Sequence, residues 1–234
     1  MTLKLNRWQL AQEYEKSWWA SYKGDIEWYK NFSNEIIEKI QKFIKIRENT
    51  YILEIGSGPA GGITFLNSKN KYAIDPLADF FGNNKYWANF RDKRVQYKTC
   101  KGEDLPFDNN QFDLIIIDNV LDHCDNPILV LNEMNRVIKN GGVIFFRQNI
   151  YNIWGRFMRS IMEIFLVDKG HPFTFGNKQL LTYFKQRHWT IKLAENTGYF
   201  QAWINNFNSF TIKKIIQNML FIIRNRSLFI LAKT

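Results

Sequence analysis

The sequence predicts an α/β protein in which a parallel β-sheet is covered by helices on both faces. From Thr50 onward, short apolar runs alternate with turn residues and helical stretches, a texture typical of strands that are buried on both sides. Over 127–140 apolar residues recur at helical spacing between two such runs, which indicates a strand–helix–strand crossover. A chain of 234 residues can bury one continuous core.

The order of the elements follows from these runs. Residues 1–48 are rich in charged and aromatic side chains at amphipathic helical spacing, so we expect a helical N-terminal cap. The main domain covers 49–234, with insertions near 150–176 and 199–226. Asn140, Gly141 and Gly142 are expected to close the helix over 127–140, and another helix is expected over 178–186. The expected strands are 51–55, 72–74, 95–99, 112–117, 143–147, 190–194 and 227–232.

Composition excludes several classes of protein. Cys100 and Cys124 are the only cysteines, and their spacing fits neither a zinc site nor a redox pair, so no metal is expected. No run approaches the roughly 20 apolar residues of a membrane-spanning helix. The N-terminus lacks the apolar core of a signal peptide, so we expect a reducing, cytoplasmic location. The net charge of +10 suits nucleic acid, anionic glycans or an acidic bilayer, and equally a solvated basic surface.

The segment 52–62 runs from a predicted strand into a glycine loop and then into a predicted helix. Glycine lets the backbone approach a ligand closely there, and the start of a helix presents free N–H groups. Gly56, Gly58 and Gly61 satisfy the dinucleotide pattern G-x-G-x-x-G, and Asp75 follows at a distance suited to ribose hydroxyls. The segment therefore predicts a cofactor that contains a nucleoside.

Glu54 discriminates between two such cofactors. It stands two residues before the first glycine, at the end of an otherwise apolar strand. A buried negative charge beside the pyrophosphate of NAD is electrostatically unfavourable, whereas a cationic sulfonium is attracted to it. Glu54 therefore favours S-adenosylmethionine, with the alternative that its carboxylate accepts hydrogen bonds from the N–H groups of the loop.

The segment resembles the class I S-adenosylmethionine-dependent methyltransferases, and within them the group called methyltransferase type 11. The E-x-G-x-G-x-G motif of the family is met here, with Ala60 in place of the third glycine. Asp75 takes the place of the acidic residue that holds both ribose hydroxyls in the family. By this resemblance, the cofactor contacts in the first half of the site are Glu54, Gly56, Ser57, Gly58, Asp75 and Pro76.

Two later segments extend the resemblance. An acidic adenine-binding turn that leads into L-P-F and then F-D is matched by 102–107 and 112–113, although Lys101 stands where many members have aspartate. The segment 117–127 looks like the V-L-E-H of the family followed by a proline, with Asp122 replacing the glutamate. These matches add the cofactor contacts Gly102, Glu103, Asp104, Leu105, Asp118, Asn119 and His123.

The resemblance covers residues 50 to about 148. It implies a Rossmann-like, doubly wound sheet of seven strands, mostly parallel, with an antiparallel last strand. It also implies that the methyl donor lies over the carboxyl ends of the strands and that the methyl points into a pocket formed by the insertions. The expected acceptor is a small molecule or a glycan, a lipid-linked sugar included, methylated on oxygen. The sequence carries no signal for an oligomeric state.

Two histidines are candidate catalytic bases, because an oxygen acceptor must lose its proton. His123 lies in the loop beside the expected methyl position, and the alternative is that it packs the loop. His171 belongs to an H-P segment similar to those that line the acceptor side in relatives, and the alternative is a turn residue. His188 is expected to be structural.

The insertions and the cap carry further candidates. The apolar residues of 154–165 form one helical stripe, which we expect to pack, with a roof over the acceptor pocket or contact with an anionic bilayer as alternatives. The lysine-bearing segment 213–224 would share that membrane contact. Tyr14 and Trp19 lie in a segment that resembles N-terminal segments folding over the donor in related enzymes.

Three other functions stay open. An NAD-dependent oxidoreductase is suggested by the glycine pattern, but Glu54 and the L-P-F turn oppose it. A binding protein that keeps the fold without catalysis is suggested by Ala60, Lys101 and Asp122, which depart from the family. An RNA methyltransferase would use the positive charge, but aromatic side chains interleaved with lysine and arginine on one surface are not evident, so no nucleic-acid partner is expected.

Overall fold

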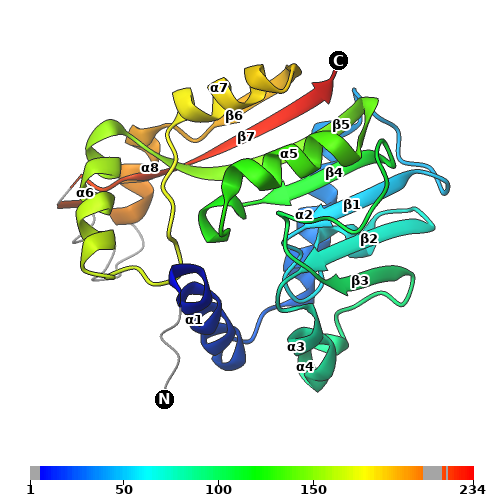
Figure 1. Ribbon diagram of the computed structural model, residues 1–234, viewed down its shortest axis with the longest axis horizontal. Helices are drawn as coiled ribbons and strands as arrows, with labels where there is room; N and C mark the ends of the chain where they lie inside the picture. Colours follow the sequence, from blue (N-terminus) through cyan, green and yellow to red (C-terminus); the bar gives the residue numbers. More distant parts are fainter. Residues whose placement is uncertain (1–5, 208–217, 220) are drawn as a thin grey trace.

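A seven-stranded sheet forms the centre of the computed structural model, which describes residues 6–207, 218–219 and 221–234 (Figure 1). The strand order is β3-β2-β1-β4-β5-β7-β6, and β7 runs antiparallel to both of its neighbours. The other pairs are parallel, which confirms the predicted doubly wound fold. The strands are β1 Tyr51–Ile55, β2 Asn70–Asp75, β3 Val95–Thr99, β4 Phe112–Asp118, β5 Ile138–Tyr151, β6 Trp189–Asn196 and β7 Arg224–Lys233.

Helices cover both faces of the sheet, with α5 and α7 on one face and α2 on the other (Figure 1). Side chains alternate along each strand and so feed two separate cores. Leu53 packs in the core that contains Met134 of α5, and Ile52 packs in the core that contains Ile36 of α2. The helices are α1 Arg7–Ser21, α2 Ile26–Ile40, α3 Ala78–Asn83, α4 Lys85–Ala88, α5 Pro127–Val137, α6 Ile153–Ile164, α7 Asn177–Gln186 and α8 Tyr199–Phe207, with the 3-10 helices η1 Gly62–Phe65 and η2 Leu121–His123.

The end of α5 differs from the prediction. The helix ends at Val137, and Ile138 already belongs to β5. The glycines of 140–142 therefore do not close the helix; they lie in a bulge of β5, where the register with β4 shifts and Gly141 has a φ of 75°. Positive φ favours glycine in a helix cap and in a bulge alike, so the sequence pattern did not separate the two.

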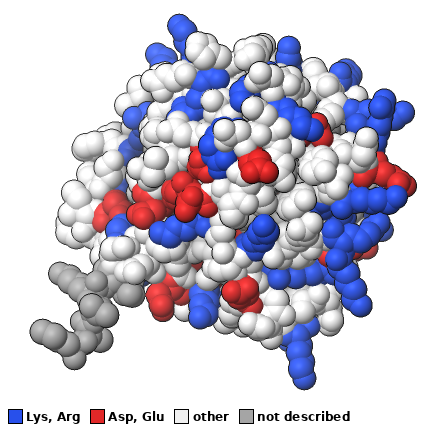
Figure 2. All heavy atoms as spheres, turned by 45° about the vertical axis from the view of Figure 1, so that its right-hand side comes forward, with Lys and Arg blue, Asp and Glu red and all other residues white. Residues whose placement is uncertain are grey.

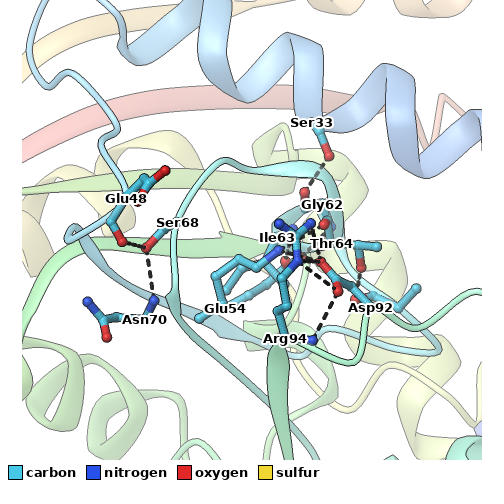
Figure 3. Close-up of polar contacts among 12 residues, drawn as sticks. Ser33, Glu48, Glu54, Gly62, Ile63, Thr64, Ser68, Asn70, Asp92 and Arg94 are labelled. Carbon is cyan, nitrogen blue, oxygen red and sulfur yellow. Dashed lines mark hydrogen bonds and ion pairs between the residues drawn. The ribbon is translucent and has the colours of Figure 1, made fainter.

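The helix expected after the glycine loop is also different, because only the four-residue η1 forms there. The N-terminal helix α2 packs directly against it. A Cβ added at Gly62 would lie 2.7 Å from Cδ1 of Ile36, and the Ser33 hydroxyl donates to the carbonyl oxygen of Gly62 (Figure 3). Part of the predicted N-terminal cap thus covers the face of the sheet that a longer helix would have covered.

The apolar stripe over 154–165 does not pack as predicted. Trp154, Phe157 and Phe165 are 50%, 55% and 73% exposed, whereas Arg159 is buried. The helix α6 turns its arginine inward because that side chain has a charged partner, Asp168, at 2.7 Å. The lysines of 213–217, assigned to the same surface from the sequence, lie outside the described residues.

No helix among the residues described here is long and apolar enough to cross a bilayer. The charged side chains on the face seen in Figure 2 are interspersed, with acidic groups lying among the lysines and arginines. That distribution fits the solvated basic surface weighed from the composition.

Candidate functional site

A cavity of about 230 Å³ opens at the carboxyl ends of β1, β2 and β4, where the strand order reverses. Most of the predicted cofactor contacts meet in its wall. Those in the wall are Gly56, Gly58, Asp75, Pro76, Gly102, Glu103, Asp118, Asn119 and His123. The predicted contacts outside the wall are Glu54, Ser57, Asp104 and Leu105.

The glycine loop forms the floor of the cavity, and its backbone conformation requires glycine. Gly56 and Gly58 have φ values of 68° and 58°. A Cβ at Gly56 would lie only 2.4 Å from Cγ2 of Val120. Gly61 also has positive φ, and a Cβ there would lie 2.5 Å from Oε2 of Glu54. The second close approach in this loop is therefore made by Gly61 and not by residue 60, so Ala60 is accommodated.

Glu54 lies beneath the loop (Figure 3). Its two carboxylate oxygens accept hydrogen bonds from the N–H groups of Gly62, at 3.1 Å, and Ile63, at 2.7 Å. Burial raises the pKa of Glu54 to about 8, although these two hydrogen bonds oppose the rise. These N–H groups, which were expected to face a ligand, thus donate to Glu54. This is the alternative to a contact between the Glu54 carboxylate and a sulfonium.

Asp75 connects the end of β2 to the same loop. Its Oδ2 accepts from the N–H of Gly58 at 2.9 Å, and its Oδ1 accepts from the N–H of Leu77 at 2.8 Å. Burial raises the pKa of Asp75, and these hydrogen bonds oppose the rise. Each carboxylate oxygen has a second acceptor site, so the side chain can still accept from two ribose hydroxyls.

The predicted adenine turn divides into residues inside and outside the cavity. Gly102 is buried in the wall beside Glu103, whose Oε1 accepts from the N–H groups of Asp125, at 2.8 Å, and Asn126, at 3.0 Å. Asp104 is exposed to solvent and Leu105 is buried in the core. The turn thus presents one acidic side chain to the cavity, and that side chain also fixes the loop before α5.

At the end of β4 the cavity wall is held by Arg147. The Nε and Nη2 atoms of Arg147 donate to the two oxygens of Asp118 at 2.7 and 2.6 Å. The next residue, Asn119, has a φ of 55°, and its Oδ1 accepts from the N–H of Asn149 at 3.0 Å. Both wall residues are therefore fixed by side chains or backbone of β5.

The helix α1 lies off the carboxyl ends of the strands and forms the roof (Figure 1). Trp19, a candidate from the sequence, lies in the wall, but Tyr14 does not; it contacts Gly170 instead. The sequence missed three other roof residues, although their spacing of four and three residues places them on one face of a helix with Trp19. These three are Trp8, Gln12 and Glu15.

The two candidate bases lie together. The ring centroids of His123 and His171 are 4.4 Å apart, although only His123 lies in the cavity wall. His171 Nδ1 is 2.8 Å from Oδ1 of Asp168, and Arg159 pairs with the other oxygen of that carboxylate. Burial lowers the pKa of His171, but the hydrogen bond to Asp168 and the charge of Asp122 outweigh burial, so the pKa is raised. His188 lies elsewhere, exposed at the end of α7.

Among the described residues, one group of side chains has the geometry of a candidate cation site. Asp122, His123 and His171 each present one atom, and these atoms lie within 4.8 Å of one another. Oδ1 of Asp122 already accepts from Nε2 of Gln148 at 2.8 Å. The set thus combines two imidazoles with a carboxylate that is hydrogen-bonded within the protein.

Comparison with known proteins finds a match to a methyltransferase domain. Residues 53–146 match a family model described as a methyltransferase domain. A demethylmenaquinone methyltransferase of Staphylococcus carnosus is 48% identical over 114 residues, which cover 45% of this chain and 46% of that protein. A malonyl-[acyl-carrier protein] O-methyltransferase of Marinomonas is 23% identical over 143 residues, covering 59% of this chain and 50% of that protein.

The solved structure of geranyl diphosphate C-methyltransferase from Streptomyces coelicolor, in complex with S-adenosyl-L-homocysteine, superposes with a TM-score of 0.64 at 13% identity. The superposition covers 88% of this chain and 80% of that one, so the fold is shared. The matches to the first curated relatives span 30%, 51% and 48% of their lengths.

The chain thus has the fold of the class I S-adenosylmethionine-dependent methyltransferases. Residues 53–146 match the methyltransferase domain family, and the proteins named above that resemble the chain are methyltransferases.

Proposed function

We propose that this chain transfers the methyl group of S-adenosylmethionine to a hydroxyl oxygen of a small molecule or a glycan, lipid-linked sugars included. The observation that carries the proposal is the pair of Asp168 and His171, which lies beside His123 of the cavity wall. A hydroxyl group keeps its proton at neutral pH and must lose it as the new bond forms, so a positioned base is useful. Amine acceptors need less assistance.

When bound, S-adenosylmethionine supplies an electrophilic methyl group on a sulfonium. The protein contributes position and proton transfer. The helix α1 covers the cavity, and alignment of the reacting groups can contribute roughly 7–11 kcal/mol. Asp168 holds Nδ1 of His171, which leaves Nε2 to accept the hydroxyl proton, and the carboxylate then stabilises the imidazolium.

The same histidines could instead bind a cation, but their surroundings favour proton transfer. Asp168 is engaged by Nδ1 of His171 and by Arg159, and Asp122 is engaged by Gln148. Arg159 neutralises the charge of Asp168, and the hydrogen bond from Gln148 occupies one acceptor site of Asp122. We therefore assign the pair to acid–base chemistry.

A lipid-linked acceptor is supported by the exposed apolar side chains of α6, which include Ile153, Phe157 and Ile164. Such a helix can rest on an anionic bilayer. Co-sedimentation with vesicles that contain anionic lipid tests this part of the proposal: Phe157→Ser should sediment less than the wild type, and a wild type that stays in the supernatant indicates a soluble acceptor. The free Cys100 and Cys124 support the cytoplasmic location expected from the sequence.

The proposal is tested by measuring S-adenosylhomocysteine formation with a panel of hydroxyl, amine and carbon acceptors. We expect turnover with hydroxyl compounds. His171→Asn should slow it by about 10²–10⁴-fold without changing the affinity for the donor. His188→Asn is the control, because the φ of 56° at that exposed position suits asparagine. Transfer to amines or carbon alone, or full turnover in His171→Asn, contradicts the proposal.

A further inference from the structure

A second cavity, of about 370 Å³, adjoins the donor cavity. The two cavities share Asp118 and Asn119, the residues at the end of β4. Apart from Ala202 the described lining of the second cavity is polar, and it contains no aromatic ring. Its described lining residues are Asp118, Asn119, Arg147, Asn149, Thr197, Ala202, Asn205, Arg224 and Arg226.

Three arginines reach this cavity from two neighbouring strands. Arg147 lies on β5, and Arg224 and Arg226 lie at the start of β7. Because β7 is antiparallel to β5, its first residues lie beside the carboxyl end of that strand, where Arg226 pairs with Asn149 and Arg224 pairs with Tyr151. A spacing of two residues places both arginines of β7 on one face of the sheet.

The charges in this cavity do not cancel. Arg147 is neutralised by Asp118 and by Glu35, which lie 2.6 and 2.7 Å from it. The guanidinium groups of Arg224 and Arg226 make no hydrogen bond or ion pair with any residue of the described chain. Partial burial, and then the positive charge of Arg147, lower the pKa of Arg226. Three arginines face two carboxylates, Asp118 and Glu35, so one positive charge is in excess.

We propose that this arginine cavity binds an anionic group, a phosphate or a carboxylate, of the methyl acceptor. The inference rests on the proposed methyl transfer, and it narrows the acceptor to an acidic small molecule or an acidic sugar. Guanidinium groups bind such oxygens in bidentate fashion, and Thr197 and Asn205 add neutral polar contacts. An anion held there places the rest of the acceptor toward Asp118 and Asn119, the wall shared with the donor.

Nucleic acid is the less suitable ligand for this site. Binding of single strands typically combines a long basic groove with aromatic rings on which bases stack. The cavity is local and offers asparagine and threonine rather than rings. A single acidic group on a small acceptor fits this chemistry better.

The test is calorimetric titration of the protein, saturated with S-adenosylhomocysteine, at constant ionic strength. The probes are inorganic pyrophosphate, inorganic phosphate and malonate, with chloride as the reference. Binding of pyrophosphate or phosphate indicates a phosphorylated acceptor, and binding of malonate indicates a carboxylated one. We expect Arg226→Gln and Arg224→Gln each to weaken binding at least tenfold, which corresponds to about 1.4 kcal/mol.

Arg47→Gln is the matched control, because Arg47 is exposed at the amino ends of the strands, at the opposite edge of the sheet. The inference is overturned if no probe binds more tightly than chloride, or if Arg47→Gln weakens binding equally. It is also overturned if a short single-stranded RNA displaces bound pyrophosphate and the Arg226→Gln variant does not bind that RNA. Retained binding of S-adenosylhomocysteine shows that the variants are folded. Failure of the wild type to bind S-adenosylhomocysteine contradicts the proposed function itself, whereas binding without any anion effect contradicts only this inference.

Discussion

Arg147 connects the stability of the fold to the shape of the donor cavity. It is 2% exposed, and it pairs with Asp118 of β4 and with Glu35 of α2. Its guanidinium also stacks on the ring of Phe32, with 4.4 Å between the guanidinium carbon and the ring centroid. One side chain on β5 thus joins the central sheet, the helix behind it and the cavity wall.

We predict that Arg147→Met lowers the free energy of unfolding by about 3 kcal/mol. Removing one partner of a buried ion pair typically costs about 3–5 kcal/mol, because the remaining charge is left uncompensated. The lower end applies here, since water can partly solvate Asp118 and Glu35, which are 19% and 37% exposed. At roughly 2–4 °C per kcal/mol, the melting temperature should fall by about 6–12 °C.

Thermal unfolding and urea denaturation measure this loss. Arg94→Met is the control, because Arg94 is 65% exposed in its pair with Asp92 and should cost less than about 1 kcal/mol. Adding Asp118→Asn to Arg147→Met should recover part of the loss, since the uncompensated carboxylate is then gone. A fall of less than about 2 °C in Arg147→Met, or an equal fall in the control, refutes the reasoning.

Further predictions concern the loop and the base. Glu54, with a pKa raised from 4.5 to about 8, binds its proton more tightly in the folded protein, so stability from this group is present below about pH 4.5 and is lost as the pH rises toward 8. The melting temperature of Glu54→Gln should therefore depend less on pH over this range. Gly56→Ala, whose Cβ would lie 2.4 Å from Cγ2 of Val120, should weaken S-adenosylhomocysteine binding at least tenfold in calorimetry. Because the pKa of His171 is raised above 6.5, turnover should decline as the pH falls through that raised pKa, and His171→Asn should remove this decline.

Each of these predictions has a matched control. Glu48→Gln alters an exposed carboxylate and should leave the wild-type pH dependence of stability almost unchanged. In Gly141→Ala the alanine must also adopt a positive φ, but its Cβ meets no atom within 4 Å. This variant should bind the donor as the wild type does, whereas Gly56→Ala adds the collision with Val120. The reasoning about each site fails if Glu54→Gln keeps the wild-type pH dependence, if Gly56→Ala binds normally, or if His171→Asn keeps the acidic decline.

The strands could be predicted where their limits are set locally. β1 and β3 begin and end at the expected residues, because apolar or β-forming runs stop there at turn residues. β5 is longer than expected at both ends. Its extension toward Tyr151 pairs with Arg224 of β7, more than 70 residues away in the chain, and such a non-local pairing leaves no local signal.

The site was predictable where backbone conformation or position along a strand decides the role. Gly56, Gly58 and Asp75 meet in the cavity because strand ends and positive φ values follow from residue type. The direction of a side chain does not. Glu54 turns beneath the loop because the N–H groups of η1 donate hydrogen bonds to its carboxylate. The residues that form the roof of the cavity depend on how α1 packs against the sheet. The spacing that begins at Trp8 identifies one face of the helix but not what that face covers.

The central claim is that the cavity at β1, β2 and β4 holds S-adenosylmethionine. The most direct measurement is thermal unfolding of the protein alone, with S-adenosylmethionine, with S-adenosylhomocysteine and with NAD. A ligand at about 100 times its dissociation constant adds roughly 2.7 kcal/mol, so we predict a rise of several degrees with both adenosyl ligands, reduced in Asp75→Ala. A rise with NAD alone, or no rise with either adenosyl ligand, would contradict the claim.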